Sequence, residues 1–206
     1  MTSKRKAHWE NVYRSKSDDQ VGWFQPSPRL SLEMIMSANL GPDDGIIDIG
    51  GGASRLIDAL LAQGFHNLSV LDISATALET TQARLGIGAE EVNWLVNDVT
   101  DFTLEQPVSL WHDRAVFHFL TTPEERTAYL KHTEQYLVIG GHLIIAAFSP
   151  DGPKKCSGLD IVQYDSNSIQ RTLSNRYQLL ECVSELHQTP WGAQQHFNYF
   201  HFIRID

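Results

Sequence analysis

Three short apolar runs, each associated with an acidic residue, constrain the fold of this chain more than any other feature. The first run carries Asp48 and leads into three glycines at positions 50–52, the second ends in Asp72, and the third is followed by Asp98. Such runs are typical of buried strands, and glycines after a strand let a ligand approach the backbone because they carry no Cβ. Strands ending in acids at one sheet edge predict a nucleoside pocket.

Strands and helices alternate along most of the chain, which indicates a parallel, doubly wound sheet. A glycine pair, Gly140-Gly141, is expected to break the chain before the fifth strand. Pro190 and Gly192 form a turn that makes the last two strands antiparallel neighbours. The expected strands are 46–50, 68–72, 92–96, 108–112, 143–148, 177–187 and 195–205, and the expected helices are 7–16, 28–40, 54–63, 75–85, 123–137 and 165–174.

Composition narrows the class of protein. The 206 residues, 42% of them hydrophobic, support a single domain over residues 1–206 with a full core. A formal net charge of −9 argues against nonspecific binding to nucleic acid or anionic membranes. No apolar run approaches the roughly 20 residues of a membrane span. Two cysteines without CxxC spacing fit a reducing compartment, so a cytoplasmic protein is predicted, with no prediction of its oligomeric state.

The glycine turn alone does not choose among nucleoside cofactors. A dinucleotide fingerprint needs a third glycine where this chain has Arg55, which counts against NAD. Asp72, at the end of the second strand, is placed to accept hydrogen bonds from both ribose hydroxyls. Asp98 is placed to accept from an adenine amine while the amide of Val99 faces a ring nitrogen; the alternative for Asp98 is a loop acid that caps a turn.

Three motifs together resemble a known family. Residues 46–52 (IIDIGGG), Asp72-Ile73 and Asp98-Val99 are similar to the first three motifs of class I S-adenosylmethionine-dependent methyltransferases, and the likeness covers nearly the whole chain. The resemblance implies an α/β, Rossmann-like, doubly wound seven-stranded sheet, mostly parallel, with a C-terminal antiparallel hairpin. It also implies S-adenosylmethionine as cofactor and S-adenosylhomocysteine as product.

The same resemblance assigns roles to the first motif. Gly50 and Gly52 would contact the methionine portion of the cofactor through their backbone. Asp48 would order the glycine loop and lie near the amino group of that portion.

The N-terminal segment narrows the match. Its residues 9–14 (WENVYR) and 22–24 (GWF) resemble the start of methyltransferases that modify lysine in elongation factor 1A and citrate synthase, and more distantly the thiopurine methyltransferases. The resemblance implies that Trp9, Tyr13 and Trp23 fold over the cofactor, within a helical and aromatic lid formed by residues 1–40. Aromatic faces attract a sulfonium cation, and a lid excludes water. The alternative is that these aromatics only attach the N-terminus to the core.

The segment after the fourth strand is expected to face the ligand, because open α/β sheets bind beyond the carboxyl ends of their strands. Asp113-Arg114 matches the acid–basic start of the lysine methyltransferase pattern, but Ala115 replaces its glycine and His118 its later acid, which puts a lysine substrate in doubt. His118 is the candidate general base, since its ordinary pKa is about 6.5; the alternative is a histidine bonded to a carbonyl. Asp113 is expected to order the methionine end of the cofactor, and His112 to point into the sheet.

The remaining polar residues near the expected site have weaker roles. Arg114 is expected to form a structural ion pair, with binding of an anionic substrate group as the alternative. The loop 149–159 is expected to cover the acceptor side of the pocket. Its Lys154 and Lys155 would suit an anionic acceptor, although solvated lysines are favoured, and Cys156 is expected to be an ordinary loop cysteine. The histidines of the hairpin do not make a convincing metal site, and methyl transfer needs no metal.

The predicted function is therefore S-adenosylmethionine-dependent methyl transfer to an N, O or S atom of a small molecule. Within the same class, protein-lysine N-methylation is the alternative. Two readings from other classes stay open: a non-catalytic module that binds a nucleoside without turnover, and an NAD-dependent oxidoreductase.

Overall fold

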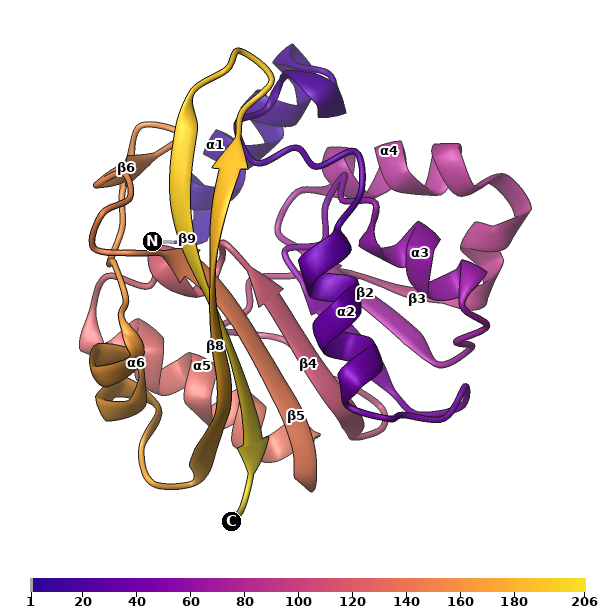
Figure 1. Ribbon diagram of the computed structural model, residues 1–206. Coiled ribbons are helices and arrows are strands. Elements are labelled where there is room, and N and C mark those ends of the chain that lie inside the picture. The colour runs from indigo at the N-terminus through magenta and orange to yellow at the C-terminus, as the bar shows by residue number, and fades with distance from the viewer. Residues whose placement is uncertain (1) are drawn as a thin grey trace.

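The computed structural model describes residues 2–206, so Met1, the first residue of the expected domain, lies outside the described residues. One sheet contains seven strands in the order β3-β2-β1-β4-β5-β9-β8 (Figure 1). Neighbours from β3 to β5 are parallel, and β9 is antiparallel to both β5 and β8, which confirms the expected fold class. The strands are β1 (Ile46–Ile49), β2 (Leu68–Asp72), β3 (Val92–Val96), β4 (Val108–Arg114), β5 (Leu137–Phe148), β8 (Tyr177–Gln188) and β9 (Gln194–Arg204).

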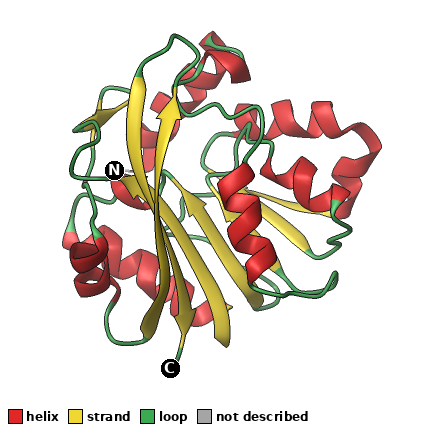
Figure 2. Ribbon diagram, in the orientation of Figure 1, coloured by secondary structure: helices red, strands yellow, loops and turns green. Residues whose placement is uncertain are grey.

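Helices cover both faces of the sheet (Figure 2). Side chains alternate between the faces along each strand, so Ile46 and Ile47 of β1 belong to different core clusters. Helices α5 and α6 pack on one face, and α2, α3 and α4 on the other. The α-helices are α1 (Thr2–Ser15), α2 (Arg29–Ser37), α3 (Leu56–Ala62), α4 (Ala75–Leu85), α5 (Pro123–Tyr136) and α6 (Ser166–Leu173); the 3-10 turns are η1 (Asp18–Gln20), η2 (Gly86–Glu91) and η3 (Phe117–Phe119).

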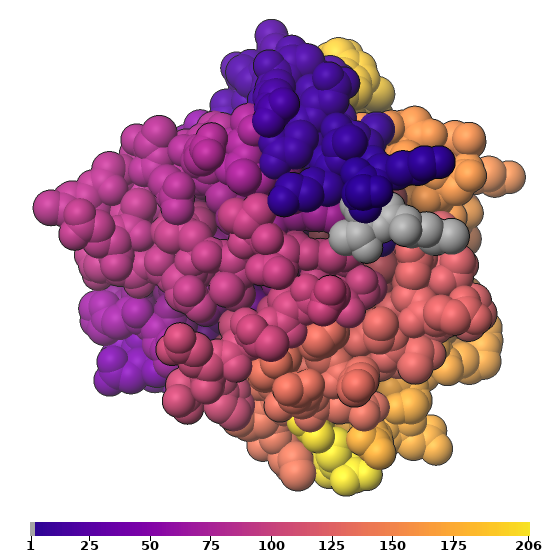
Figure 3. Space-filling model, turned by 180° about the vertical axis from the view of Figure 1, so that it is seen from behind, coloured from indigo at the N-terminus to yellow at the C-terminus, as the bar shows by residue number. Residues whose placement is uncertain are grey.

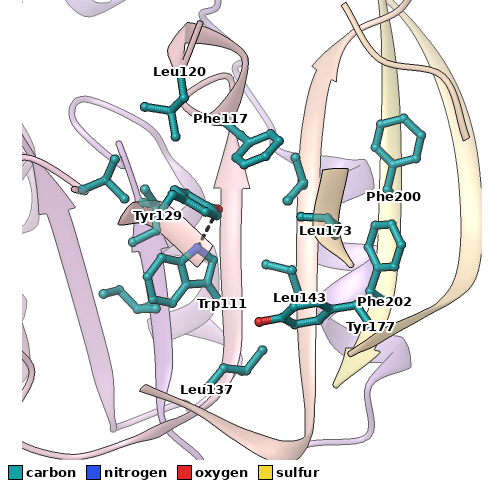
Figure 4. Packing of buried hydrophobic residues seen from close by; sticks show 14 of the residues in the cluster. Trp111, Phe117, Leu120, Tyr129, Leu137, Leu143, Leu173, Tyr177, Phe200 and Phe202 are labelled. Carbon is teal, nitrogen blue, oxygen red and sulfur yellow. Dashed lines mark hydrogen bonds between the residues drawn. The ribbon is translucent and has the colours of Figure 1, made fainter. Parts of the chain in front are cut away.

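The core beneath α5 contains many large aromatic residues packed among aliphatic ones (Figure 4). The indole Nε1 of Trp111 on β4 donates a hydrogen bond to the Tyr129 hydroxyl of α5 at 2.8 Å, and both side chains are fully buried. Truncating a buried aromatic of this size costs about 3–5 kcal/mol. This contact fixes α5 on the strand whose carboxyl end faces the candidate site.

Strand β5 departs from the expected boundary. It begins at Leu137, not at residue 143, and runs through Gly140-Gly141. Val108 pairs with Leu137 but Leu110 pairs with His142, so the residues between them bulge out of register. Gly140 has φ +80°, and a Cβ on Gly141 would lie 2.8 Å from the Val138 oxygen. The glycine pair therefore shifts the register of the strand without ending it.

The two helices of the N-terminal region, α1 and α2, lie in different places. Helix α1 begins at Thr2, earlier than the expected residue 7, and lies across the top of the molecule between the magenta and orange parts of the chain (Figure 3). Helix α2 instead packs Met34 and Ile35 into the core. The expected lid over residues 1–40 thus comprises a covering helix and a helix that belongs to the sheet packing.

The loop 149–159 contains a small hairpin that the sequence did not predict. Strands β6 (Lys155–Cys156) and β7 (Leu159–Asp160) are joined by Ser157 and Gly158, with φ of 50° and 79°. Two consecutive positive φ values are typical of the tight turns that join hairpin strands. Among residues 2–206, none of the helices is long and apolar enough to cross a membrane.

Candidate active site

A cavity of about 710 Å³, partly open to solvent, lies at the carboxyl ends of the central strands. Because β1 lies between β2 and β4, the cavity extends to both sides of it. We call the part lined by Leu71, Asp72, Ile73, Asn97, Asp98 and Val99 the nucleoside half. We call the part lined by Arg114, Ala115, Phe119 and Cys156 the acceptor half. Gly50 lies between them, at the point where strand order reverses and open α/β sheets bind their ligands.

The glycine turn after β1 has no space for side chains. Gly52 has φ +41°, and a Cβ there would lie 2.7 Å from Asp72 Oδ2 and 3.0 Å from the Tyr13 hydroxyl. A Cβ on Gly51 would lie 2.7 Å from Asp48 Oδ2. The turn therefore packs its backbone directly against the carboxylates of β1 and β2. Of its three glycines, Gly50 lines the first cavity, whereas Gly52 is not on the wall of either cavity.

Asp72 is a buried carboxylate that faces the cavity. Burial raises its pKa to about 7, against the lowering effect of the hydrogen bond from the Ser74 amide, and the charges of Asp48 and Glu10 raise it further. That amide donates to Oδ1 at 2.8 Å, while Oδ2 lies beside Gly52. Hydroxyl donors from a ribose would stabilise the ionised form in this position.

Asp98 caps a turn, which was the alternative prediction, and it also lies on the cavity wall. Its Oδ1 accepts hydrogen bonds from the Thr100 amide at 3.0 Å and the Thr100 hydroxyl at 2.7 Å, which is the turn cap. The residue also lines the nucleoside half together with Val99. Its Oδ2 lies 4.0 Å from a guanidinium nitrogen of Arg5, a residue on α1 that was not among the predicted site residues.

The three predicted aromatic residues all line the cavity. The Trp23 indole Nε1 donates to the Tyr13 hydroxyl at 3.2 Å. The Trp9 ring lies edge-on to Trp23 and to Phe119, with centroid distances of 5.5 Å and 5.3 Å. The aromatic cluster thus connects the covering segment to the acceptor half. The same three side chains attach the N-terminal segment to the core and line the cavity.

Helix α1 is held over the cavity by polar contacts. Glu10 accepts hydrogen bonds from the Ala75 amide at 2.7 Å and the Thr76 hydroxyl at 2.6 Å, at the N-terminus of α4. Burial would raise the pKa of Glu10, but these hydrogen bonds and the charge of Arg14 outweigh it and lower the pKa. A carboxylate at a helix N-terminus also interacts favourably with the helix dipole. Arg5 adds a 2.5 Å bond to Glu125.

A second cavity of about 560 Å³ lies behind the glycine turn and shares Tyr13, Trp23, Gly50 and Arg114 with the first. Asp48 lines it, and its Oδ1 lies 2.7 Å from His112 Nδ1. The predicted role of Asp48 in ordering the turn is compatible with its position beside Gly51. His112 was expected to point into the sheet; it is buried, but it lines this second cavity beside Asp48.

Asp113 is buried away from both cavities, contrary to the expectation that it faces the cofactor. Its Oδ1 accepts from the amides of Val116 and Phe117 at 2.9 Å and 3.1 Å, and its Oδ2 accepts from the Tyr129 hydroxyl at 2.9 Å. The carboxylate is thus engaged in holding the turn after β4, because α5 brings Tyr129 beneath it.

His118 is not on the wall of either cavity, so the structure does not bring the candidate base to the site. Its ring is fully buried between Phe119 and Phe148, with centroid distances of 4.5 Å and 5.0 Å. Neither ring nitrogen has a hydrogen-bond partner among the described residues, so the alternative of a bond to a carbonyl is also wrong. Burial lowers the pKa of His118 to about 3, and the charge of Arg114 adds to this.

Arg114 forms structural contacts, as expected. Its Nε donates to the Tyr199 hydroxyl at 2.7 Å, its Nη1 donates to the Trp23 carbonyl at 3.0 Å, and its Nη2 lies 3.9 Å from Glu185. Lys155 is exposed and pairs with Asp160 at 3.1 Å, away from the cavity wall. Cys156, in contrast, is buried on that wall, and burial raises the pKa of its thiol to about 12.

Comparison with known proteins agrees with this geometry. Residues 46–141 match the family model of a methyltransferase domain. EEF1A lysine methyltransferase 2 of Danio rerio is 28% identical over 138 residues, which cover 62% of this chain and 59% of that protein. This chain therefore spans about three fifths of the length of that relative.

Solved structures share the fold. The 1,6-didemethyltoxoflavin-N1-methyltransferase of Burkholderia thailandensis has a TM-score of 0.74 at 18% identity, covering 100% of this chain and 91% of its own. The N-methyltransferase NodS of Bradyrhizobium japonicum, in complex with S-adenosylhomocysteine, has a TM-score of 0.72 at 16% identity, covering 96% and 98%. Residues 46–141 thus match a methyltransferase domain, and the chain shares its fold with solved methyltransferases, one of them in complex with S-adenosylhomocysteine.

Proposed function

We propose that this protein transfers the methyl group of S-adenosylmethionine to an N, O or S atom of a small molecule. One observation carries the proposal. The buried carboxylate of Asp72 and the first glycine of the turn, Gly50, line one wall of a cavity that continues past Gly50 into an aromatic acceptor half.

The residues present fit the cofactor. Asp72 would accept from the ribose hydroxyls, and Asp98 with Val99 would hold the adenine edge, with Ile73 on the same wall. Gly50 and Gly52 would offer their backbone to the methionine portion, and Asp48 would lie near its amino group. Trp9, Tyr13 and Trp23 would cover the sulfonium, whose charge is attracted by aromatic faces.

The charge of the acceptor half supports a small-molecule acceptor over a lysine. The titratable groups of the acceptor half are Arg114 and Cys156, and its described lining contains no carboxylate. A lysine ammonium entering there would meet the charge of Arg114, which Glu185 offsets only in part from 3.9 Å, and no acidic group on the lining of this half would bind or deprotonate it. A neutral or anionic acceptor meets no such barrier.

The mechanism assigned to this chain is positioning. The bound cofactor supplies an already activated methyl group. The aromatic cluster and α1 exclude water from the cavity, and the strand-end carboxylates hold the donor in place, so that donor and acceptor are aligned for in-line displacement. Since His118 and Asp113 lie outside the cavity lining, we propose that no protein base acts and that an acceptor proton is lost to bulk water when the methylated product leaves the cavity.

Calorimetry with S-adenosylhomocysteine tests the proposed cofactor site. Wild-type protein is expected to bind, and Asp72→Asn to bind at least roughly tenfold more weakly, because it loses a charged acceptor for two hydroxyls. Asp43→Asn, an exposed acid before β1, is the matched control and should bind like wild type. Absence of binding to the wild-type protein would overturn the proposal.

The acceptor class is tested by incubating the protein with methyl-labelled S-adenosylmethionine and cell lysate, then separating proteins from metabolites. Label in the metabolite fraction supports a small-molecule acceptor. Label in a protein fraction would favour the lysine alternative. The partial match to EEF1A lysine methyltransferase 2 is the observation that supports this alternative.

Label in neither fraction, with tight S-adenosylhomocysteine binding, would favour a non-catalytic module.

A cytoplasmic location stays a prediction, based on two free cysteines.

A further inference from the structure

The loop that carries Trp23 is attached to the C-terminal hairpin, far away in sequence. Figure 1 shows the tips of β8 and β9 rising beside the N-terminal segment. His187 Nε2 lies 2.8 Å from the Gly22 carbonyl, to which it donates. The Gln25 side-chain amide donates to both oxygens of Glu185, at 3.2 Å and 3.3 Å. The hairpin thus holds residues on both sides of Trp23.

Arg114 attaches Trp23 itself. Its Nη1 donates to the Trp23 carbonyl at 3.0 Å. Its Nε donates to the Tyr199 hydroxyl of β9, and that hydroxyl donates to Glu185 Oε2 at 3.1 Å. The guanidinium carbon lies 4.8 Å from the centroid of the Phe197 ring, which adds a cation–π contact. Arg114 is therefore oriented by the hairpin before it reaches the loop.

The loop also contacts the hairpin through packing. A Cβ on Gly22 would lie 3.2 Å from the Trp191 indole, so the backbone at Gly22 approaches the hairpin tip closely. His187 is buried, and so is most of Arg114, whose side chain is 11% exposed. Hydrogen bonds shielded from water hold geometry better than exposed ones.

Trp23 lies where the two cavities meet the aromatic cluster. Its ring lines both cavities, donates to the Tyr13 hydroxyl and packs against Trp9. A shift of its loop would open the acceptor half to water and misalign the aromatic faces. None of the contacts that fix this loop to the hairpin involves Asp72, Asp98 or the glycine turn.

We propose that Glu185 and Arg114 are positioning residues: through Gln25 and the Trp23 carbonyl, the β8–β9 hairpin sets the position of Trp23 over the methyl-transfer site. This inference rests on the proposed function. It makes the C-terminal hairpin a part of the site without contact to the reacting atoms.

The test uses the full chain labelled with 5-fluorotryptophan, whose Trp23 signal in the ¹⁹F NMR spectrum is assigned by its loss in Trp23→Phe. Glu185→Gln removes the charge that orients Gln25 and Arg114, and we expect it to shift or broaden the Trp23 signal. The signal of Trp111, buried in β4, should stay in place. Affinity for S-adenosylhomocysteine should fall roughly three- to tenfold, the effect of one weakened charged hydrogen bond. Glu181→Gln, an exposed acid on the same strand, should change neither.

Conservative rescue separates positioning from general support. His187→Ala removes the donor to Gly22 and should move the Trp23 signal, whereas His187→Gln keeps a donor and should move it less. If wild type binds S-adenosylhomocysteine but Glu185→Gln leaves the Trp23 signal and affinity unchanged, the inference is wrong while the proposed function stands. If Trp23 and Trp111 signals change together with the melting temperature, Glu185 has a general structural role and the inference is also wrong. If wild type does not bind, the proposed function itself fails.

Discussion

His112 Nδ1 lies 2.7 Å from Asp48 Oδ1, so the aspartate of the first motif is held by the neighbouring strand as well as by its own. Ser31 of α2 lies 2.9 Å from the other ring nitrogen of the same histidine. This chain of contacts connects α2, β4 and β1 directly beneath the glycine turn.

Replacing His112 should therefore destabilise the fold. His112→Phe leaves the buried oxygens of Asp48 without this partner, and we expect the free energy of unfolding to fall by about 2–4 kcal/mol. Urea denaturation measures the change. The double variant with Asp48→Asn should lose less than the sum of the two single variants; strict additivity would show that the contact contributes nothing.

Asp72 should trade stability for binding. Its folded-state pKa is raised to about 7, so its favourable contribution is full below its unfolded pKa and is lost as pH rises through 7. Asp72→Asn should thus raise the stability of the ligand-free protein at neutral pH, by roughly 2–4 kcal/mol, with a smaller gain at pH 4.

In wild type, affinity for S-adenosylhomocysteine should rise between pH 6 and 8 as Asp72 ionises. Calorimetry across this range checks the expectation. A flat affinity profile, or a variant no more stable than wild type at pH 7, would contradict it.

The parts of the site that lie close together along the chain could be predicted from local patterns. Asp72 ends β2 and Gly50 directly follows β1, and the alternation of strands and helices places these two strand ends at one edge of a parallel sheet. Trp9, Tyr13 and Trp23 line the cavity, and the prediction that they would do so came from the family resemblance, not from the periodicity of the sequence.

What could not be predicted depends on partners distant in sequence. From the sequence, Asp113 is predicted to face the ligand because it lies at a strand end. In the structure, Tyr129 of α5 donates a hydrogen bond to its carboxylate, which the local sequence does not indicate. Glu10 reads as a polar helix residue until α1 meets the N-terminus of α4. His118 lies in a short 3-10 turn, and the path of this turn places its ring beside Phe148. The local sequence does not predict this orientation.

Gly52 should tolerate no side chain. Gly52→Ala combines a left-handed backbone with a Cβ 2.7 Å from Asp72 Oδ2, so we expect loss of S-adenosylhomocysteine binding and a marked fall in melting temperature. Gly64→Ala is the matched control, since Gly64 has φ +85° but nothing within 4 Å of its Cβ. Its cost should be about 1–2 kcal/mol of backbone strain alone, with binding intact. Equal behaviour of the two variants in calorimetry would refute the close approach.

Glu10 should couple the covering helix to the cofactor site. Glu10→Ala removes two acceptors at the N-terminus of α4, and we expect a loss of about 1–2 kcal/mol in unfolding free energy and weaker S-adenosylhomocysteine binding. Because the pKa of Glu10 is lowered on folding, its contribution is present above pH 4.5 and is lost as pH falls below that. Glu33→Ala, an exposed acid on α2, should change neither quantity. Unchanged binding by Glu10→Ala would show that α1 does not cover the site.

His118 should be dispensable for catalysis. Its pKa is lowered to about 3, whereas an unfolded histidine titrates near about 6.5, so the unfolded chain takes up a proton first and wild-type stability declines as pH falls from 6.5 toward 3.

His118→Phe removes this effect and two unpartnered ring nitrogens, within a pocket already lined by Phe119 and Phe148. We expect equal or higher stability at pH 7 and a larger gain at pH 5, measured by thermal denaturation. Methyl transfer to the lysate acceptor pool should stay within about twofold of wild type, because a base contributes roughly a hundredfold or more where one acts. A hundredfold loss of transfer, with melting temperature and S-adenosylhomocysteine affinity intact, would instead require that His118 rotates into the acceptor half during turnover.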